Sequence, residues 1–151
     1  MGDERVAAPG ACLRGREFAF FHDLDDEAFG ELRALARWRR FAVGTPLLRA
    51  GEPGDFFCVL LAGTARIVQG GRAVGLLAAG DCCGEMAWLR PNAGARRVDV
   101  VAESEGELIE IPVAALAAAS CRLRHGVDRA FLHLLLDRLE QADSGLASVT
   151  L

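Results

Sequence analysis

The sequence predicts one domain of mainly β structure with flanking helices, in which short antiparallel strands form a sandwich or barrel. Two observations carry this prediction. Residues 41–112 hold 11 of the 17 glycines, and short apolar stretches lie between them. Strands separated by glycine turns about every 8–12 residues are typical of antiparallel sandwiches and barrels. The length of 151 residues leaves room for one sizeable core and little more.

The part of the chain before the strands is expected to contain a loose lead-in and a helix. Residues 1–17 show no hydrophobic period and form the lead-in. From 18 to 38 the pattern is helical, because Leu24 precedes an acidic run at 25–27 that is favourable at a helix N-terminus. Behind it, apolar residues recur at helical spacing: Phe29, Leu32, Leu35 and Ala36.

The clearest turn of the middle region is Gly70-Gly71, since both central residues of a two-residue hairpin can take positive φ. It joins strands at 64–69 and 72–78. A later strand at 107–111 closes the barrel and stops at Pro112.

Two helices are expected after the strands, at 113–119 and 127–141. The second carries one apolar stripe, which is either core against the strands or a dimer seam: Phe131, Leu134, Leu135 and Leu139. Because Gly145 weakens a helix, residues 143–151 are predicted to be a short C-terminal tail.

One segment interrupts the strand rhythm and holds the candidate chemistry. Residues 80–89 end a strand at glycine and then run helix-like for one or two turns, and a short loop leads to Arg96-Arg97. The N-terminus of a helix inserted in a barrel presents free backbone N–H groups to an anion. An arginine across the loop adds a charge-assisted contact suited to phosphate. Glu85 can accept hydrogen bonds from sugar hydroxyls.

Two glycine motifs complete the pattern: Gly44-x-x-Leu47-x-x-x-Gly51-Glu52-x-Gly54-Asp55-x-Phe57-x-Val59-x-x-x-Gly63, and Gly80-Asp81-x-x-Gly84-Glu85-Met86-Ala87 with Arg96-x-x-x-Val100-x-Ala102 after it. They resemble the first half and the phosphate-binding cassette of the cyclic-nucleotide-binding domain family, as a catabolite-activator-like effector domain without its DNA-binding domain. The resemblance covers about residues 18–142. It implies an antiparallel β-roll (a jelly-roll-like double-stranded β-helix) over about 41–112, with an N-terminal helix and C-terminal helices.

The resemblance also implies a role for each residue of the cassette. The backbone of Gly84 would cradle the cyclic phosphate, Glu85 would hold the ribose 2′-hydroxyl, and Arg96 would pair with the phosphate. Met86 and Ala87 would line or support the pocket.

The chain departs from the family where a small residue usually follows the phosphate-binding arginine, because Arg97 stands there. Arg97 is either a second phosphate ligand or an outward-pointing residue, and Arg96 and Arg97 can exchange roles. Structural interpretations stand beside these. Glu85 also suits the role of a first-turn carboxylate, both arginines also suit surface positions at a barrel rim, and Gly84 also suits the backbone geometry alone. Cys82 and Cys83 are interpreted as two small core residues, in preference to a redox pair.

Composition excludes several classes of function. The net charge is −4 and all 17 basic residues are arginine, which argues against broad nucleic-acid binding. The run Arg37–Arg40 is interpreted as a solvated strand edge that resists aggregation. The three histidines lie outside 41–112, so no metal site is expected in the barrel. With no strained nucleophile elbow either, no enzyme activity and no cofactor are expected.

We therefore expect a stand-alone cytoplasmic sensor that binds cAMP or cGMP and signals to a protein partner by moving its terminal helices. Five cysteines without a framework spacing suit a reducing compartment. No apolar run approaches the roughly 18 residues of a membrane helix, and direct DNA binding is not expected. A homodimer through the C-terminal helix is possible. The alternative is a degenerate, non-binding domain that acts as a scaffold or oligomerisation module.

Overall fold

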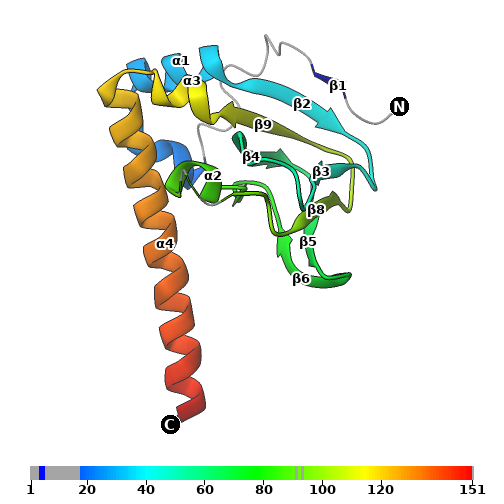
Figure 1. The fold of residues 1–151 in the computed structure, drawn as a ribbon. Helices are drawn as coiled ribbons and strands as arrows, with labels where there is room; N and C mark the ends of the chain where they lie inside the picture. Colours follow the sequence, from blue (N-terminus) through cyan, green and yellow to red (C-terminus); the bar gives the residue numbers. More distant parts are fainter. Residues whose placement is uncertain (1–3, 6–17, 91, 93, 151) are drawn as a thin grey trace.

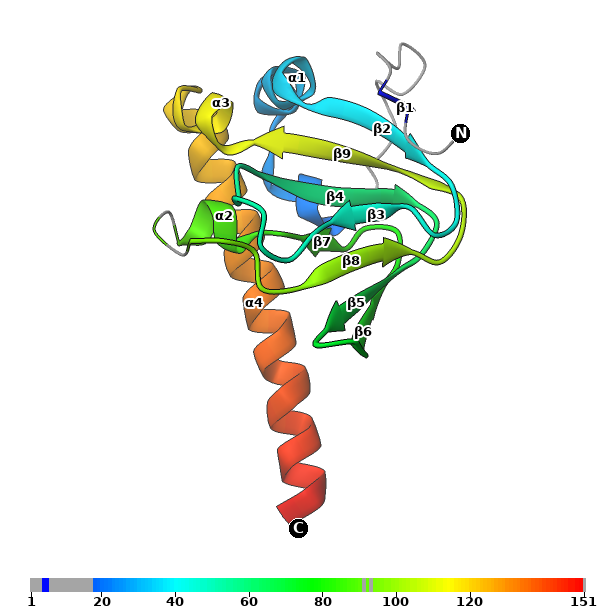
Figure 2. The same cartoon turned by 45° about the vertical axis from the view of Figure 1, so that its right-hand side comes forward.

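The computed structural model describes residues 4–5, 18–90, 92 and 94–150, so the predicted lead-in at 1–17 lies almost wholly outside the described residues (Figure 1). Two antiparallel sheets form a roll, and helices gather at one side of it (Figure 2). The strands are β1 (Glu4–Arg5), β2 (Arg37–Phe41), β3 (Pro46–Leu48), β4 (Phe56–Ala62), β5 (Ala65–Gln69), β6 (Arg72–Leu77), β7 (Cys82–Cys83), β8 (Asp99–Ala102) and β9 (Gly106–Pro112). The helices are a 3-10 turn (Ala19–Asp23), α1 (Asp26–Leu35), α2 (Met86–Leu89), α3 (Val113–Ala117) and α4 (Cys121–Thr150).

The order of the strands confirms the predicted β-roll with flanking helices. Within the described residues, one sheet runs β1-β2-β9-β4-β7 and the other β3-β8-β5-β6, with all neighbours antiparallel. The Gly70-Gly71 hairpin is confirmed as well, because both glycines have positive φ (59° and 80°) and join β5 to β6.

Strand β4 divides the core in two because its side chains alternate between the two faces of the sheet. Phe57, Val59 and Leu61 pack against the helices, in a cluster that includes Phe131 of α4. Cys58 and Leu60 enter the space between the sheets. Since both faces of β4 are buried, its sequence is a continuous apolar run without polar alternation.

The N-terminal helix is confirmed, but it ends earlier than predicted. The Asp25 carboxylate caps α1 by accepting a hydrogen bond from the N–H of Ala28 at 2.8 Å. The helix ends at Leu35, and strand β2 begins at Arg37. The roll therefore begins at Arg37, four residues before the predicted start at 41. Alternate side chains of β2, those of Arg39 and Phe41, are buried in it.

The prediction that Arg37–Arg40 is a solvated strand edge is wrong for the edge position and for Arg39, whereas Arg37 and Arg40 are exposed as predicted. Strand β2 lies between β1 and β9, and Arg39 is 5% exposed. Its Nη1 lies 3.2 Å from Oε2 of Glu110, which is fully buried, and its Nη2 donates to the Pro46 carbonyl at 3.1 Å. The buried carboxylate, 71 residues away in sequence, is what makes burial of this arginine possible.

The C-terminal helices form where the pattern indicates, but α4 is longer. It begins at Cys121 and continues through Gly145 to Thr150, so most of the predicted tail at 143–151 is helical. One glycine costs a helix about 1 kcal/mol relative to alanine, which a long helix can absorb. Figure 1 shows α4 extending well beyond the roll. None of the described helices has the length and apolar character needed to span a membrane.

Candidate functional site

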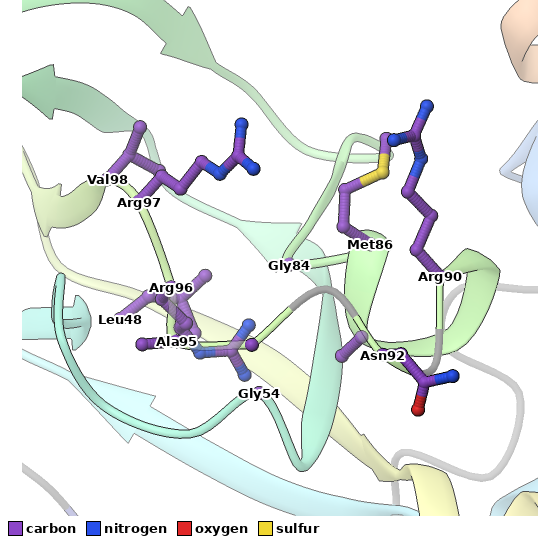
Figure 3. Close-up of a pocket in the computed structure, with 12 residues that line it drawn as sticks. Leu48, Gly54, Gly84, Met86, Arg90, Asn92, Ala95, Arg96, Arg97 and Val98 are labelled. Atoms are coloured by element: carbon purple, nitrogen blue, oxygen red, sulfur yellow. The ribbon is translucent and has the colours of Figure 1, made fainter.

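A cavity of about 850 Å³ opens at the side of the roll beside α2 (Figure 3). Three stretches of chain line this cavity, and all of them lie within the two glycine motifs or the loop that follows the second motif. They are Leu48 and Gly54; Gly84, Met86, Ala87 and Arg90; and Asn92, Gly94, Ala95, Arg96, Arg97 and Val98. The described lining contains three arginines and no carboxylate, so its charge favours an anion.

The backbone of Gly84 forms the part of the cavity wall that lies next to the Arg96 guanidinium. Strand β7 ends at Cys83, and Gly84 takes a φ of +77° before α2 begins. A Cβ on Gly84 would lie 2.7 Å from Nη1 of Arg96 and 3.1 Å from Leu48. Glycine is therefore required at this position for two reasons: the backbone conformation and the close approach of the guanidinium.

The first glycine motif holds the backbone of Arg96 in place. The N–H of Gly51 donates to the Arg96 carbonyl and the Arg96 N–H donates to the Glu52 carbonyl, both at 2.8 Å. An isolated bridge between Pro53 and Ala95 continues this pairing. The two motifs thus act together, with one presenting the arginine to the other.

The side chain of Arg96 is half-buried and has a fixed direction. Its Nη2 donates to the Phe56 carbonyl at 2.5 Å, and its guanidinium carbon lies 4.8 Å from the centre of the Phe56 ring. This cation–π contact and the hydrogen bond hold the group next to Gly54 and Gly84 (Figure 3). No carboxylate pairs with Arg96 among the described residues.

Arg97 has a different environment. Its side chain is exposed and lines the cavity, and in Figure 3 its guanidinium diverges from that of Arg96. Within the described part of the chain, no hydrogen bond or ion pair holds it. The structure therefore places Arg96, and not Arg97, against the cassette glycine.

Glu85 is the one predicted site residue that does not line the cavity. Its side chain is 14% exposed, and its Oε1 lies 3.3 Å from Nη1 of Arg138 on α4. A second contact joins the same elements, since Nε1 of Trp88 donates to Oδ1 of Asp128 at 2.8 Å. Helix α2 is thereby attached to α4 at two points, one of them through the residue predicted to hold the ribose.

The structure brings the other predicted residues together at one cavity. Gly84, Met86, Ala87, Arg96 and Arg97 all line the cavity, and Met86 is 46% exposed at its mouth. Sequence reasoning missed the part played by Phe56, whose ring and carbonyl orient Arg96, and the presence of Arg90 and Asn92 in the lining. The arginine at the start of the loop at 90–95 was a signal in the sequence that this loop contributes to the cavity.

Cys82 and Cys83 are buried core residues, as the structural interpretation predicts. Cys82 packs in the cluster that includes the helices, and Cys83 packs between the sheets. Burial raises the pKa of the Cys82 thiol well above its usual range.

Comparison with known proteins identifies the family. A model of the cyclic nucleotide-binding domain matches residues 38–120. No curated protein matches the chain.

Solved structures share the fold. A cyclic nucleotide-binding domain from Methylobacillus flagellatus KT is 20% identical, with a TM-score of 0.82 over 99% of this chain and 90% of that one. The catabolite activator protein of Thermus thermophilus is 27% identical, with a TM-score of 0.67 over 87% of this chain, which spans 63% of that protein. The regulatory domain of Toxoplasma gondii PKA, solved with cAMP, is 22% identical, with a TM-score of 0.64 over 75% of this chain and 46% of that one.

The family match covers more than half of the 151 residues and includes both glycine motifs and Arg96. Together with the roll and the anion-favouring cavity, it shows that the chain belongs to the cyclic nucleotide-binding domain family.

Proposed function

We propose that this chain is a regulatory sensor domain that binds cAMP or cGMP in the cavity beside α2. The observation that carries the proposal is the guanidinium of Arg96, held against Gly84 without a carboxylate partner among the described residues. Arginine has five N–H donors, and the Phe56 carbonyl takes one of them. The remaining donors and the backbone N–H groups at the start of α2 are available to a cyclic phosphate.

The ribose would bind next to the phosphate and reach Glu85. That carboxylate has a partner in Arg138, so the sugar hydroxyl would either share Glu85 with α4 or displace Arg138 from it. In both cases, nucleotide binding changes a contact that α4 makes with the cassette. This is the physical basis for a signal in which the terminal helix changes its position relative to the roll.

The receiver of that signal is proposed to be a protein, with a second copy of the chain as one candidate. On its exposed face, α4 carries Leu132, Leu135 and Leu139, whose spacing is that of alternating a and d positions of a heptad. A homodimer through α4 predicts that Leu135→Glu with Leu139→Glu lowers the mass measured by sedimentation to that of a monomer, whereas Glu140→Gln does not. A monomeric wild type at high concentration would contradict it.

We place this sensor in the cytoplasm. All four cysteines that the structure describes are free thiols, as suits a reducing compartment: Cys58, Cys82, Cys83 and Cys121. The cyclic nucleotide-binding domain is generally a non-enzymatic regulatory domain, so we propose neither an enzyme activity nor a cofactor for the chain.

The direct test of the proposed function is a thermal shift with each nucleotide. A ligand that binds the folded state alone raises the unfolding temperature. We expect cAMP or cGMP at millimolar concentration to raise it in the wild type and in Arg72→Ala, an exposed arginine on the far hairpin, but not in Arg96→Ala. No shift with either nucleotide in the wild type would contradict the sensor.

A second candidate is a degenerate domain that serves as a scaffold or oligomerisation module. Two observations favour it. Glu85 already pairs with Arg138, and the bulky Arg97 stands where the family has a small residue. If neither nucleotide raises the unfolding temperature, the exposed leucines of α4 become the functional surface to examine.

A further inference from the structure

Two buried thiols face each other at the base of the cassette. Cys58 on β4 and Cys83 on β7 are direct partners in the antiparallel register. They are 0% and 6% exposed, and both pack between the sheets. The neighbouring Cys82 pairs in register with Val59, and its side chain enters the other core. Among the residues that the structure describes, Cys83 therefore has a thiol partner on the facing strand and Cys82 does not.

The geometry of this pair is close to that of a disulfide. Directly opposite residues of an antiparallel pair have Cβ atoms about 4.5–5.5 Å apart, and a disulfide needs about 3.5–4.5 Å. A closure of about 1 Å would allow the bond. Strand β7 can supply it, because it has two residues, lies at the edge of its sheet, and is flanked by Gly80 and Gly84, both with positive φ.

The reactivity of the pair depends on opening of β7. Burial raises the pKa of the Cys58 thiol well above its usual range, and the neighbouring Cys83 thiol raises it further. Since the thiolate is the reactive form, Cys58 is slow to react while β7 is paired with β4, and burial keeps Cys83 away from solvent in the same state. Separation of this short edge strand exposes them to solvent and to small oxidants.

We propose that Cys58 and Cys83 form a modification site at which hydrogen peroxide produces an intramolecular disulfide. The thiolate of one cysteine attacks a peroxide oxygen, the O–O bond breaks, and a sulfenic acid and one water form. The second thiol then attacks the sulfenic sulfur, the S–S bond forms, and a second water leaves with its proton. Two thiols and one peroxide thus give a disulfide and two waters, with two electrons passing from sulfur to oxygen.

The location of the bond predicts its effect. Gly84 follows Cys83 directly, and the Arg96 guanidinium rests against Gly84. Drawing β7 toward β4 therefore moves the wall of the cavity relative to Arg96. Under the proposed function, on which this consequence rests, the disulfide lowers nucleotide affinity by about tenfold, which corresponds to a misplaced charge-assisted contact.

The chemical step is tested without any nucleotide. In a chain carrying Cys12→Ser and Cys121→Ser, the folded protein is treated with hydrogen peroxide, alkylated, digested and analysed by mass spectrometry. We expect a peptide cross-linked between Cys58 and Cys83, retained in Cys82→Ala and lost in Cys83→Ala and Cys58→Ala. Absence of that cross-link in the folded protein, or equal cross-linking of Cys58 to Cys82, would overturn the proposal.

The regulatory consequence is tested by titrating cAMP and cGMP into the reduced, the oxidised and the dithiothreitol-treated protein. We expect weaker binding after oxidation and full recovery after reduction, with no change in Cys83→Ala. Equal affinities of the oxidised and reduced forms would overturn the regulatory role. If the reduced protein binds neither nucleotide, the proposed function fails, while the cross-link result still decides the modification site.

Discussion

Arg39 and Arg96 both place a guanidinium against the roll, but the groups around them differ. Arg39 is nearly inaccessible and meets the buried carboxylate of Glu110 at 3.2 Å. Arg96 is half-buried and meets a backbone carbonyl, an aromatic ring and the edge of a cavity. The charge of the first is neutralised within the protein. The charge of the second is oriented by neutral groups, which is the arrangement expected of a binding residue.

The comparison teaches that partners, and not burial alone, separate a structural arginine from a functional one. A buried ion pair gives little net stability but is costly to break, because one charge is then left without compensation. A fixed arginine with unused donors adds little to folding and is available to a ligand. The two sites should therefore respond in opposite ways to mutation.

The largest effect is expected on the structural side, from Glu110→Ala. Removing the carboxylate leaves Arg39 buried without its partner, so the free energy of unfolding should fall by about 3–5 kcal/mol. Urea denaturation measures this. The matched control is Glu103→Ala, which breaks the exposed pair with Arg66 (3.9 Å) and should cost less than about 1 kcal/mol. Equal losses for the two variants would remove the distinction between buried and exposed pairs.

On the binding side, Arg96→Ala should reduce nucleotide affinity by about 100-fold, or about 2.7 kcal/mol, and leave the free energy of unfolding nearly unchanged. Calorimetric titration beside urea denaturation separates the two quantities. Arg97→Ala serves as the control and should change affinity by less than tenfold, because its guanidinium diverges from that of Arg96. A larger loss in Arg97→Ala than in Arg96→Ala would reverse the roles assigned to them.

A smaller effect on binding is expected from Gly84→Ala. The new Cβ would meet Nη1 of Arg96 at 2.7 Å and displace it, so affinity should fall by about tenfold. Stability should also fall by about 1–2 kcal/mol, because alanine is strained at a φ of +77°. Gly44→Ala is the control, since Gly44 has a similar φ of +84° with open space around it. It should lose similar stability and keep full affinity, and a loss of affinity there would indicate a general effect of strain.

Features that depend on local sequence could be predicted. The Gly70-Gly71 turn and the helix that starts at the acidic run 25–27 each follow from the preferences of a few adjacent residues. The cassette spacing indicated Gly84 and Arg96 together, because a short helix and one loop join them.

Features that depend on distant partners could not be predicted. The burial of Arg39 needs Glu110, and the orientation of Glu85 needs Arg138, 53 residues away. A run such as Arg37–Arg40 has the same charge pattern whether or not a carboxylate lies opposite it. Similarly, the thiol pair of Cys58 and Cys83 depends on strand register, which the sequence pattern does not specify.

The central claim is that the guanidinium of Arg96, held between Gly54 and Gly84, is the phosphate site. A crystal structure of the protein grown with cAMP tests it most directly. We expect phosphate oxygens within hydrogen-bond distance of the Arg96 guanidinium and of the backbone N–H groups at the start of α2. A phosphate bound by Arg97 instead, or a cavity left empty by saturating nucleotide, would contradict it.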